Sequence, residues 1–366
     1  MANRVRTPNY GTAARLFPPT LVEDTTDYGL VLLRTAILYV DAASAEVGSN
    51  TLVNLGTAGV SLDLQIGSTS GADTNDPLLL THTGVDYLYL PTGSSVGCTA
   101  PATATGYKAY PLGGGAATTG AATGGAAFSF ATAGSWLHID LVDGSDVVVA
   151  SFLPVDAFTP VYTDTLAVDW TITRPATGLK ASVVKSPHFL FGPDDWIEHA
   201  DTPALDFGAS DDFTVVFAYR FWGTPSSDPG ALIGKRFAPG QQNGWAISNG
   251  GGGSELQTVF QMQGDLGSHN VYSIARAAGD FNVSTGVRHA TAATVDNYLA
   301  DTPVTTTTSP TGDLSNDKKF VIGHSDWTGA GFQFEGEFYT AAVFDYALTA
   351  QEVIAVASYL YGRFDL

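Results

Sequence analysis

Residues 332 to 344 alternate between apolar and polar side chains. The apolar positions share one parity, namely Phe332, Phe334, Phe338, Ala342 and Phe344. Positions of the other parity include Gln333, Glu335, Glu337 and Tyr339. A period of two residues predicts a strand with one face in a core and the other face in solvent. We therefore expect Phe334 and Phe338 to be buried, and the carboxylates of Glu335 and Glu337 to face water.

A change of period after this strand predicts a helix near the C-terminus. Apolar residues recur there at helical spacing, at Val353, Val356, Ala357 and Leu360. Thr349 and Glu352 form the Thr-x-x-Glu pattern of a capping box, which satisfies free backbone N–H groups at the start of a helix. Gly362 favours a helix end. The prediction is one helix from Ala350 to about Tyr361.

Short apolar or alternating runs, separated by residues that favour turns, predict strands in the rest of the chain and place it in the all-β class. In the first half these runs are Leu30–Leu33, Ile37–Val40, Val60–Ile66, Tyr87–Leu90, Trp136–Val142 and Val147–Phe152. Asp143 and Gly144 lie between the last two runs and predict a hairpin turn. The tract from Gly113 to Ala127 contains only Gly, Ala and Thr. We expect a mobile loop or a surface turn there.

Length and composition indicate two globular domains. A chain of 366 residues exceeds one typical domain, and 44% hydrophobic residues are enough for packed cores. We expect an extended arm over residues 1–28, a β-rich domain over 29–164 and a second domain over 165–366. The boundary falls near residue 165, where a short strand pattern at 168–172 precedes a Pro-Ala-Thr-Gly turn.

Five segments resemble, in the same order, the motifs of laminin G-like, concanavalin A-like jelly rolls. They are FLFGPDDWIEHADTPALDFGASDDFTVVFAYRF at 189–221, ALIGKRF at 231–237, NGWAISN at 243–249, TVDNYLADTPV at 294–304 and FEGEFYTAAVFDYALTAQEV at 334–353. Asn297 stands where the family has the glycine of a Val-Asp-Gly turn. The resemblance covers roughly the C-terminal half. It implies an antiparallel β-sandwich jelly roll with a short C-terminal helix over 165–366, preceded by a β-rich domain that resembles a divergent jelly roll.

The charge distribution excludes several classes of partner. The formal net charge is −20, and Lys108 is the only lysine or arginine between Arg34 and Arg174. DNA, RNA and anionic membranes would repel such a chain. Positive charge is concentrated in the N-terminal arm at three residues, Arg4, Arg6 and Arg15. This pattern suits either a frayed terminus or an arm that docks on an acidic neighbour such as a sister subunit.

The single cysteine and the N-terminal residues indicate the compartment in which the protein is made. Cys98 is the only cysteine, so no disulfide forms within the chain, and we expect a buried, inert thiol. The first residues, MANRVRTPNYGTAARLF, lack the apolar core of a secretory signal. The apolar run from Gly29 to Val40 is too short to span a bilayer. We expect a protein that is made in the cytoplasm of a host cell.

The sequence lacks several catalytic strings. Retaining glycosidases of the concanavalin A-like fold carry Glu-x-Asp-x-x-Glu, which places two carboxylates about 5 Å apart. This chain has no such string, and no P-loop or His-Glu-x-x-His string. Its histidines, at positions 82, 138, 188, 199, 269, 289 and 324, never fall at paired metal-ligand spacing. We therefore expect no enzymatic activity and no zinc site.

Loop carboxylates and tryptophans are the remaining site candidates. The resemblance implies calcium as the one cofactor to consider, with candidate ligands Asp194, Asp195, Asp211 and Asp326; the alternative is that these residues form turns. Three tryptophans lie near predicted strand ends or loops, namely Trp196, Trp222 and Trp327. Exposed rings there would stack on sugars, although tryptophans in sandwiches are more often part of the core. Trp327, in a Gly-rich loop, is the strongest glycan-binding candidate, whereas Trp245 lies within a predicted strand.

The segments GLKASVVKSPHFLFGPDDWIEHADTPALDFGASDDFTVVFAYR and EGEFYTAAVFDYALTAQEV resemble minor tail proteins of phages that infect actinobacteria. The resemblance implies a non-enzymatic virion component that is displayed outward and binds host-surface glycan. Its expected partners are other virion proteins and copies of itself, in the tail rather than the capsid. A capsid decoration protein is the alternative within a virion. A glycan-hydrolysing enzyme and a free bacterial lectin are the alternatives from other classes.

Overall fold

The computed structural model describes most of the chain between residues 25 and 364. The described residues are 25–46, 49–67, 69, 76–80, 88–90, 93–111, 117–131, 135–152, 161–163, 169–173, 182–183, 187–191, 195–221, 231–235, 243–249, 257–273, 281–308, 312–324, 334 and 336–364. The chain divides into two compact units, one of residues 1–79 with 188–366 and one of residues 80–187. The domain boundaries that the sequence predicted, 29–164 and 165–366, differ from this division because residues before 80 pack with the C-terminal part of the chain.

The larger unit is a sandwich of two sheets, A and B, each with eight strands. Sheet A has the order β24-β23-β22-β17-β26-β15-β4, with β1 also paired to β26. Its strands are β1 (Leu38–Asp41), β4 (Leu78–Leu80), β15 (His188–Phe191), β17 (Phe213–Phe221), β22 (Phe281–His289), β23 (Thr294–Leu299), β24 (Thr302–Thr308) and β26 (Gly336–Phe344). Sheet B has the order β2-β3-β16-β25-β18-β19-β20-β21. Its strands are β2 (Thr51–Leu52), β3 (Leu64–Ile66), β16 (Ile197–His199), β18 (Ala231–Lys235), β19 (Gly244–Asn249), β20 (Thr258–Gly264), β21 (Gly267–Tyr272) and β25 (Phe320–Ile322).

Strand pairing in both sheets is antiparallel wherever the register is defined. The unit therefore confirms the predicted all-β sandwich with a short C-terminal helix. No helix in the described part of the chain is long and apolar enough to cross a membrane.

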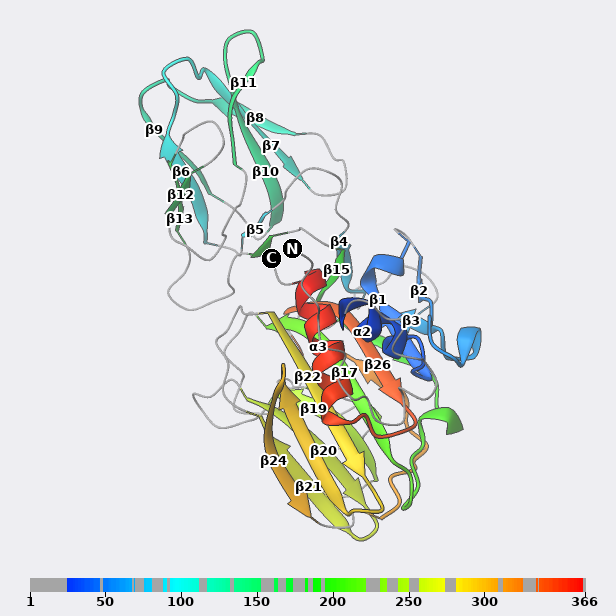
Figure 1. Ribbon diagram of the computed structural model, residues 1–366. Coiled ribbons are helices and arrows are strands. Elements are labelled where there is room, and N and C mark those ends of the chain that lie inside the picture. Colours follow the sequence, from blue (N-terminus) through cyan, green and yellow to red (C-terminus); the bar gives the residue numbers. More distant parts are fainter. Residues whose placement is uncertain are drawn as a thin grey trace. The chain divides into compact units, whose positions relative to one another are not determined.

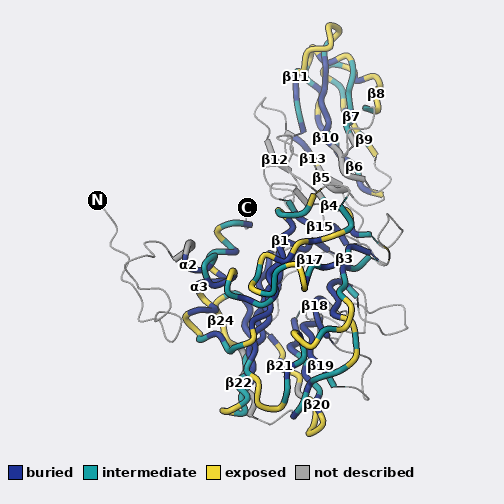
Figure 2. Tube along the Cα trace, turned by 90° about the vertical axis from the view of Figure 1, so that its right-hand side faces the viewer, coloured by how far each residue is buried: buried dark blue, intermediate teal, exposed yellow. Residues whose placement is uncertain are grey.

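The side chains that face each other across the two sheets form the main core. Strand β17 is buried at every residue (Figure 2). The rings of Phe217 on β17 and Phe338 on β26 stack with centroids 5.3 Å apart. Phe334 and Phe338 are fully buried, as the alternation predicted. Trp245 of sheet B lies 5.7 Å from Phe213 of sheet A, so the tryptophan that was expected within a strand joins the two sheets.

Two helices cover the outer face of sheet A. Helix α3 spans Ala350–Phe364 and helix α2 spans Thr25–Leu33. Figure 1 shows α3 running along β17 and β22, with α2 close by. A second apolar cluster fills this interface, and it includes Leu32, Val216, Phe344, Val356 and Leu360. Helices α2 and α3 approach closely at Gly29, because a Cβ there would lie 2.5 Å from the carbonyl oxygen of Ala355.

The expectation that Glu337 faces water is wrong. Its side chain is fully buried, because the outer face of β26 lies in a covered part of the sheet. The hydroxyl of Tyr339 donates a hydrogen bond to the Glu337 carboxylate. The guanidinium Nε of Arg220 lies 3.7 Å from the same carboxylate. The alternation suggested that Glu337 is solvated, but polar partners on the sheet take the place of water. Glu335 lies outside the described residues.

The prediction of a capped C-terminal helix is confirmed. The backbone N–H of Thr349 donates to Oε2 of Glu352 at 2.8 Å. The backbone N–H of Glu352 donates to Oγ1 of Thr349 at 3.3 Å. The helix passes the predicted end at Tyr361 and continues to Phe364. In this last turn Arg363 pairs with the buried carboxylate of Asp41 at 2.6 Å, which ties the helix end to β1.

Two strand predictions in the first half of the chain are wrong. Residues Leu30–Leu33 belong to helix α2, where leucines pack against α3 instead of entering a sheet. Val60 belongs to a 3₁₀ turn over Gly59–Leu62, and only the end of its predicted run forms a strand, β3. Further 3₁₀ turns span Ala42–Ser44 and Pro203–Leu205.

Asn297 lies inside a strand, although the resemblance suggested a turn. It belongs to β23 and is fully buried. Its side-chain amide donates to the carbonyl oxygens of Thr258 at 3.2 Å and Val271 at 2.8 Å, both on sheet B. The turn follows at Ala300, which has a positive φ of 56°. Asn297 therefore crosslinks the two sheets by hydrogen bonds.

The smaller unit contains two further antiparallel sheets, C and D. Sheet C has the order β14-β5-β10-β7-β8, with β11 paired to β10, and sheet D has the order β12-β13-β6-β9. The strands of sheet C are β5 (Leu88–Leu90), β7 (Gly106–Pro111), β8 (Thr118–Ala121), β10 (Ser135–Val142), β11 (Val148–Ser151) and β14 (Ser182–Val183). The strands of sheet D are β6 (Ser95–Thr99), β9 (Ala127–Ala131), β12 (Val161–Thr163) and β13 (Asp169–Thr173). Their shared core includes Phe152, Trp170 and, as expected, Cys98.

Two sequence predictions bear on this unit. Strands β10 and β11 pair on either side of Asp143 and Gly144, which confirms the predicted hairpin. The Gly, Ala and Thr tract was expected to be a loop or turn, yet residues Thr118–Ala121 form β8 and pair with β7. Gly120 lies close against the ring of Tyr107 on β7, since a Cβ there would lie 2.5 Å from the ring. This contact explains why a residue without a side chain occupies the strand.

Replacing Phe338 by Ala should lower the free energy of unfolding by about 3–5 kcal/mol, because the ring is removed from a close-packed core. Urea denaturation followed by near-ultraviolet circular dichroism measures this loss. Ile354→Ala is the control, because Ile354 of α3 is 41% exposed, and it should cost well under half as much. A loss below about 1 kcal/mol for Phe338→Ala would contradict the assigned core.

Candidate functional site

The structure describes only part of the candidate set from the sequence. The candidates outside the described residues are Trp222, Trp327, Asp194, Asp326, Arg4, Arg6 and Arg15. Trp196, Asp195 and Asp211 are described. Asp211 accepts a hydrogen bond from the backbone N–H of Gly208 at 2.7 Å, which is the behaviour of a turn residue. Within the described ranges, no group of three or more His, Cys, Asp or Glu side chains is arranged to hold a metal ion.

Trp196 forms an aromatic pair with His324 at the ends of two neighbouring strands. Strands β16 and β25 pair with Ile197 opposite Ile322, which brings the residues at their ends together. The two rings have centroids 5.2 Å apart and an interplanar angle of 44°. The carbonyl oxygen of Trp196 accepts a hydrogen bond from Gly67 at 2.9 Å. Backbone pairing and the imidazole therefore fix the position of the indole.

Trp196 is half-buried. Its Nε1 is buried and has no hydrogen-bond partner among the described residues. A positioned indole offers an apolar face for stacking, which is how aromatic residues receive the C–H face of a sugar ring. The aromatic pair is thus the part of the predicted glycan site that the structure describes.

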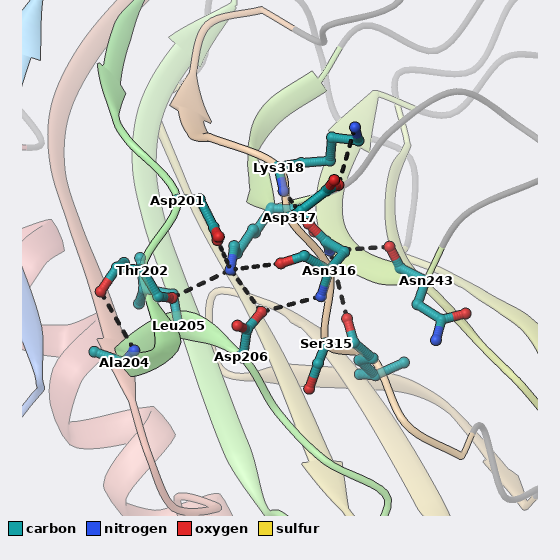
Figure 3. Close-up of polar contacts among 12 residues, drawn as sticks. Asp201, Thr202, Ala204, Leu205, Asp206, Asn243, Ser315, Asn316, Asp317 and Lys318 are labelled. Carbon is teal, nitrogen blue, oxygen red and sulfur yellow. Dashed lines mark hydrogen bonds and ion pairs between the residues drawn. The ribbon is translucent and has the colours of Figure 1, made fainter.

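The strongest polar cluster in the larger unit surrounds Lys235, which the sequence analysis did not select. Lys235 ends strand β18, and its side chain is fully buried. Its amino group lies 2.6 Å from Asp201 and 2.5 Å from Asp206. It also donates to the backbone carbonyl oxygens of Thr202 at 3.2 Å and Asn316 at 3.1 Å. Figure 3 shows these four residues around one amino group.

Asn316 connects the lysine to the neighbouring loops (Figure 3). Its side-chain amide donates to the carbonyl oxygens of Lys235 at 3.0 Å and Asn243 at 2.9 Å. Its backbone N–H donates to Oδ1 of Asp206 at 3.1 Å. Its own Oδ1 accepts from the backbone of Lys318 at 2.8 Å. Two chain segments far apart in sequence are therefore fastened to the β18–β19 hairpin.

Arg288 fastens the same two segments at a second point. Its buried guanidinium donates to the carbonyl oxygens of Gly208 at 2.9 Å, Ala209 at 3.1 Å and Gly312 at 2.8 Å. Burial lowers the pKa of Arg288, while nearby carboxylates oppose that shift. We call the segments 201–212 and 312–319, with Lys235 and Arg288 beneath them, the cation-held rim. Carbonyl groups that would need other partners are satisfied there by two buried cations.

The oxygen atoms around Lys235 can be compared with the ligands of a calcium site. Two carboxylates and two carbonyl oxygens are the kind of ligands that calcium takes. Here these oxygens surround the ammonium group, so Asp201 and Asp206 already have a cation. The described members of the predicted calcium set, Asp195 and Asp211, do not belong to this cluster.

A polar cluster in the smaller unit links His138, Asp140 and Ser151. Oδ1 of Asp140 lies 2.9 Å from Nε2 of His138 and accepts from the Ser151 hydroxyl at 2.6 Å. Burial raises the pKa of Asp140, but the hydrogen bonds from His138 and Ser151 outweigh it, so the pKa lies below its usual value. The carboxylate stands between the other two groups. A serine nucleophile needs the histidine in that middle place, so the cluster does not form a catalytic triad.

The string Gly-Ser-Ser-Val-Gly at 93–97 matches the Gly-x-Ser-x-Gly pattern of α/β-hydrolases in letters. In those enzymes the serine sits on a sharp turn between a strand and a helix. Here Ser95 begins strand β6 and pairs with Ala131 on one side and Thr173 on the other. The string is part of a sheet and does not form a nucleophile elbow.

Replacing Lys235 by Met should lower the free energy of unfolding by about 1–3 kcal/mol, because the half-buried carboxylate of Asp206 and the carbonyl oxygens of Thr202 and Asn316 lose the ammonium as a partner. Denaturant unfolding of the larger unit measures this loss. Lys319→Met is the matched control, since Lys319 pairs with Glu198 and its side chain is 50% exposed; it should cost about 1 kcal/mol or less. Equal losses in the two variants would contradict a structural role for the buried ammonium.

The lowered pKa of Asp140 predicts an acid-sensitive contribution to the stability of the smaller unit. A carboxylate with a depressed folded pKa stabilises the fold above its unfolded pKa of about 4, and that stability is lost as the pH falls. Asp140→Asn should therefore lower the melting temperature at pH 7 and flatten its dependence on pH between 5 and 3. Ser151→Ala should have a smaller effect in the same direction. A wild-type acid dependence retained in Asp140→Asn would assign it to other groups.

Comparisons with known proteins identify no family by sequence. No protein-family model matches the chain. No curated protein matches it either. The similar solved structures include domain 4 of an extracellular GH43 arabinanase from Geobacillus stearothermophilus, bound to arabinotriose, at 12% identity and TM-score 0.37, covering 50% of this chain and 83% of that one. Another is the CBM40 of the Ruminococcus gnavus IT-sialidase, at 13% identity and TM-score 0.34, covering 40% and 83%. The binding domain of Paraclostridial Mosquitocidal Protein 1 has 13% identity and TM-score 0.37, covering 60% and 49%. TM-scores this low assign neither a family nor a ligand to this chain.

Proposed function

We propose that this chain is a non-enzymatic structural component of a phage virion, a minor tail protein that displays the larger sandwich for attachment to host-surface glycan. The proposal rests first on the resemblance of two segments, residues 178–220 and 335–353, to minor tail proteins of actinobacterial phages. Support also comes from the long strand β26 and the capped helix α3, which are the elements that the resemblance implies at the end of such a domain.

Trp196 is the single observation that carries the glycan-binding part of the proposal. It is half-buried at the end of β16 and is held by His324 and by the backbone of Gly67. A ring that is already fixed loses little conformational entropy when a ligand stacks on it.

Weak intrinsic binding is sufficient for this role. A dissociation constant near 1 mM corresponds to about −4 kcal/mol per site. One stacked ring and a few hydrogen bonds supply energy of that order. Several copies on one particle would raise the avidity by roughly 10²–10⁴ without new contacts. The protein would therefore need many copies and not a deep pocket.

The buried position of Glu337 supports the non-enzymatic part of the proposal. A glycosidase needs two carboxylates that reach the scissile bond. Of Glu335 and Glu337, the two carboxylates on the last predicted strand, only Glu337 is described; it is buried and accepts a hydrogen bond from the hydroxyl of Tyr339. We propose that the chain has no hydrolase activity and uses no catalytic metal. Arg4, Arg6 and Arg15 are proposed to bind acidic neighbours in the particle.

A capsid decoration protein is the second candidate within a virion. It would use the same sandwich without a glycan site, so nothing should depend on Trp196. A free lectin would bind glycan without being incorporated into particles. Labelling intact particles with gold-conjugated antibody distinguishes tail, capsid and absence from the particle.

Replacing Trp196 by Ala should lower the affinity for host cell-wall glycan about tenfold and reduce adsorption of particles that carry it, because one stacking surface is lost. Adsorption rates of particles with verified incorporation measure the effect. Tyr272→Ala is the matched control, since Tyr272 is an exposed aromatic residue, 45% accessible, on the far edge strand of sheet B. Unchanged adsorption for Trp196→Ala, together with no bound glycan on an array, would favour the decoration role.

A further inference from the structure

Strand β8 is an exposed edge strand of the smaller unit. It pairs with β7 and ends sheet C, so its second edge has no strand partner among the described residues. All four of its residues, Thr118 to Ala121, are exposed. After five intervening residues the chain enters β9, which ends sheet D. An unpaired edge presents a row of backbone N–H and C=O groups, which are a template for another strand.

Among the other edge strands that the structure describes, β11, β2 and β14 carry features that oppose such pairing, whereas β9 of sheet D resembles β8 in having no charge and a continuous register. Strand β11 pairs with β10 through a register shift between Leu141 and Val142, and carboxylates at Asp143 and Asp146 precede it. Strands β2 and β14 have only two residues each. Bulges, charges and short length are the usual devices against edge pairing. The β7–β8 ladder has a continuous register, and β8 carries neither a charge nor a proline.

The charge pattern points to a second copy of this chain as the partner. The chain has 36 acidic and 16 basic residues, and its net charge is −20. Two copies would therefore repel each other over most of their surfaces. No Asp, Glu, Lys or Arg occurs from Ala109 to Ile139, a segment that contains both β8 and β9. Two copies can therefore meet along β8 without charges from this segment opposing each other; the nearest charges to Thr119 are Lys108, opposite it on β7, and Asp146, with which Lys108 pairs.

We propose that β8 pairs with β8 of a second copy in antiparallel orientation, so that sheet C continues across a two-fold axis. Antiparallel pairing of a strand with itself is isologous, as closed dimers require. Thr119, one of the two central residues of the strand, would lie opposite its own copy at the axis, because a sheet continues across a two-fold axis only where one residue of the edge strand pairs with itself. Four residues of strand form a small contact, so the dimer is concentration-dependent in solution. The inference uses the edge and its charge alone, and it does not rest on the proposed glycan binding.

Sedimentation velocity of the full chain over a wide concentration range tests the dimer. Thr119→Lys should raise the dimer dissociation constant about fivefold or more, since two lysines would face each other across the axis. Val148→Lys is the matched control: it adds the same charge to an exposed position on edge strand β11 and should leave association unchanged. Circular dichroism establishes that both variants fold. A wild-type chain that stays monomeric at every concentration, or equal effects of the two variants, overturns the proposal.

Cysteine crosslinking locates the contact independently. Cys98 is the only cysteine and is buried, so Thr119→Cys introduces a single accessible thiol. Under mild oxidation it should form disulfide-linked dimers much faster than Val148→Cys, because antiparallel pairing brings the two Thr119 positions close together. Equal crosslinking rates at the two positions would place any dimer contact elsewhere and overturn the pairing of β8.

Discussion

Strand β26 is the constraint on which the larger unit depends. It pairs with β17 along one side and with β15 and β1 on the other. Every residue of β26 is buried, because one face packs into the core between the sheets and the other lies in the covered outer face of sheet A. Since β1 comes from the beginning of the chain and β26 from its end, the sandwich closes only after the two ends meet. Such long-range pairing must overcome loop entropy before its contacts stabilise the fold.

Local signals in the sequence predicted the inner face of this strand and the helix after it. Two local patterns carried these predictions: the shared parity of Phe334 and Phe338, and the pair Thr349 and Glu352. Each involves residues only a few positions apart, so it can be recognised without knowledge of the tertiary structure. The outer face could not be predicted in the same way. The polarity of Glu337 suggested a solvent-exposed side chain, and only the fold brings Arg220 close to it. The run Leu30–Leu33 failed for a related reason, because a short apolar run does not distinguish a strand from a buried helix.

The contacts of the cation-held rim could not be predicted from the sequence. Lys235 stands at the end of the apolar run ALIGK, where a lysine is usually exposed, so only the fold shows that it is buried and paired. Its partners could not be named, since Asp201, Asp206 and Asn316 come from two distant segments. The resemblance directed attention to calcium ligands instead. An ammonium group and a calcium ion both neutralise carboxylates, but the ammonium is covalently tethered, so the order of these loops does not depend on a dissolved metal at this point.

The division of the chain follows from the same long-range pairing. Strands β4 and β15 are neighbours in sheet A, and the smaller unit, residues 80–187, lies between them in the sequence. An insertion that leaves and re-enters at adjacent strands does not interrupt the ladder on either side, which is why sheets tolerate insertions at such points. Local patterns divide a chain only into consecutive segments, so the residues of β2 and β3 were expected in a first domain. The end of the run Val60–Ile66 was correctly predicted as a strand and β2 was not predicted, but no local signal shows that β3 pairs with β16, more than a hundred residues later, across the inserted unit. The core of the larger sandwich thus draws on both sides of the insertion, and the smaller unit is free to carry a contact of its own.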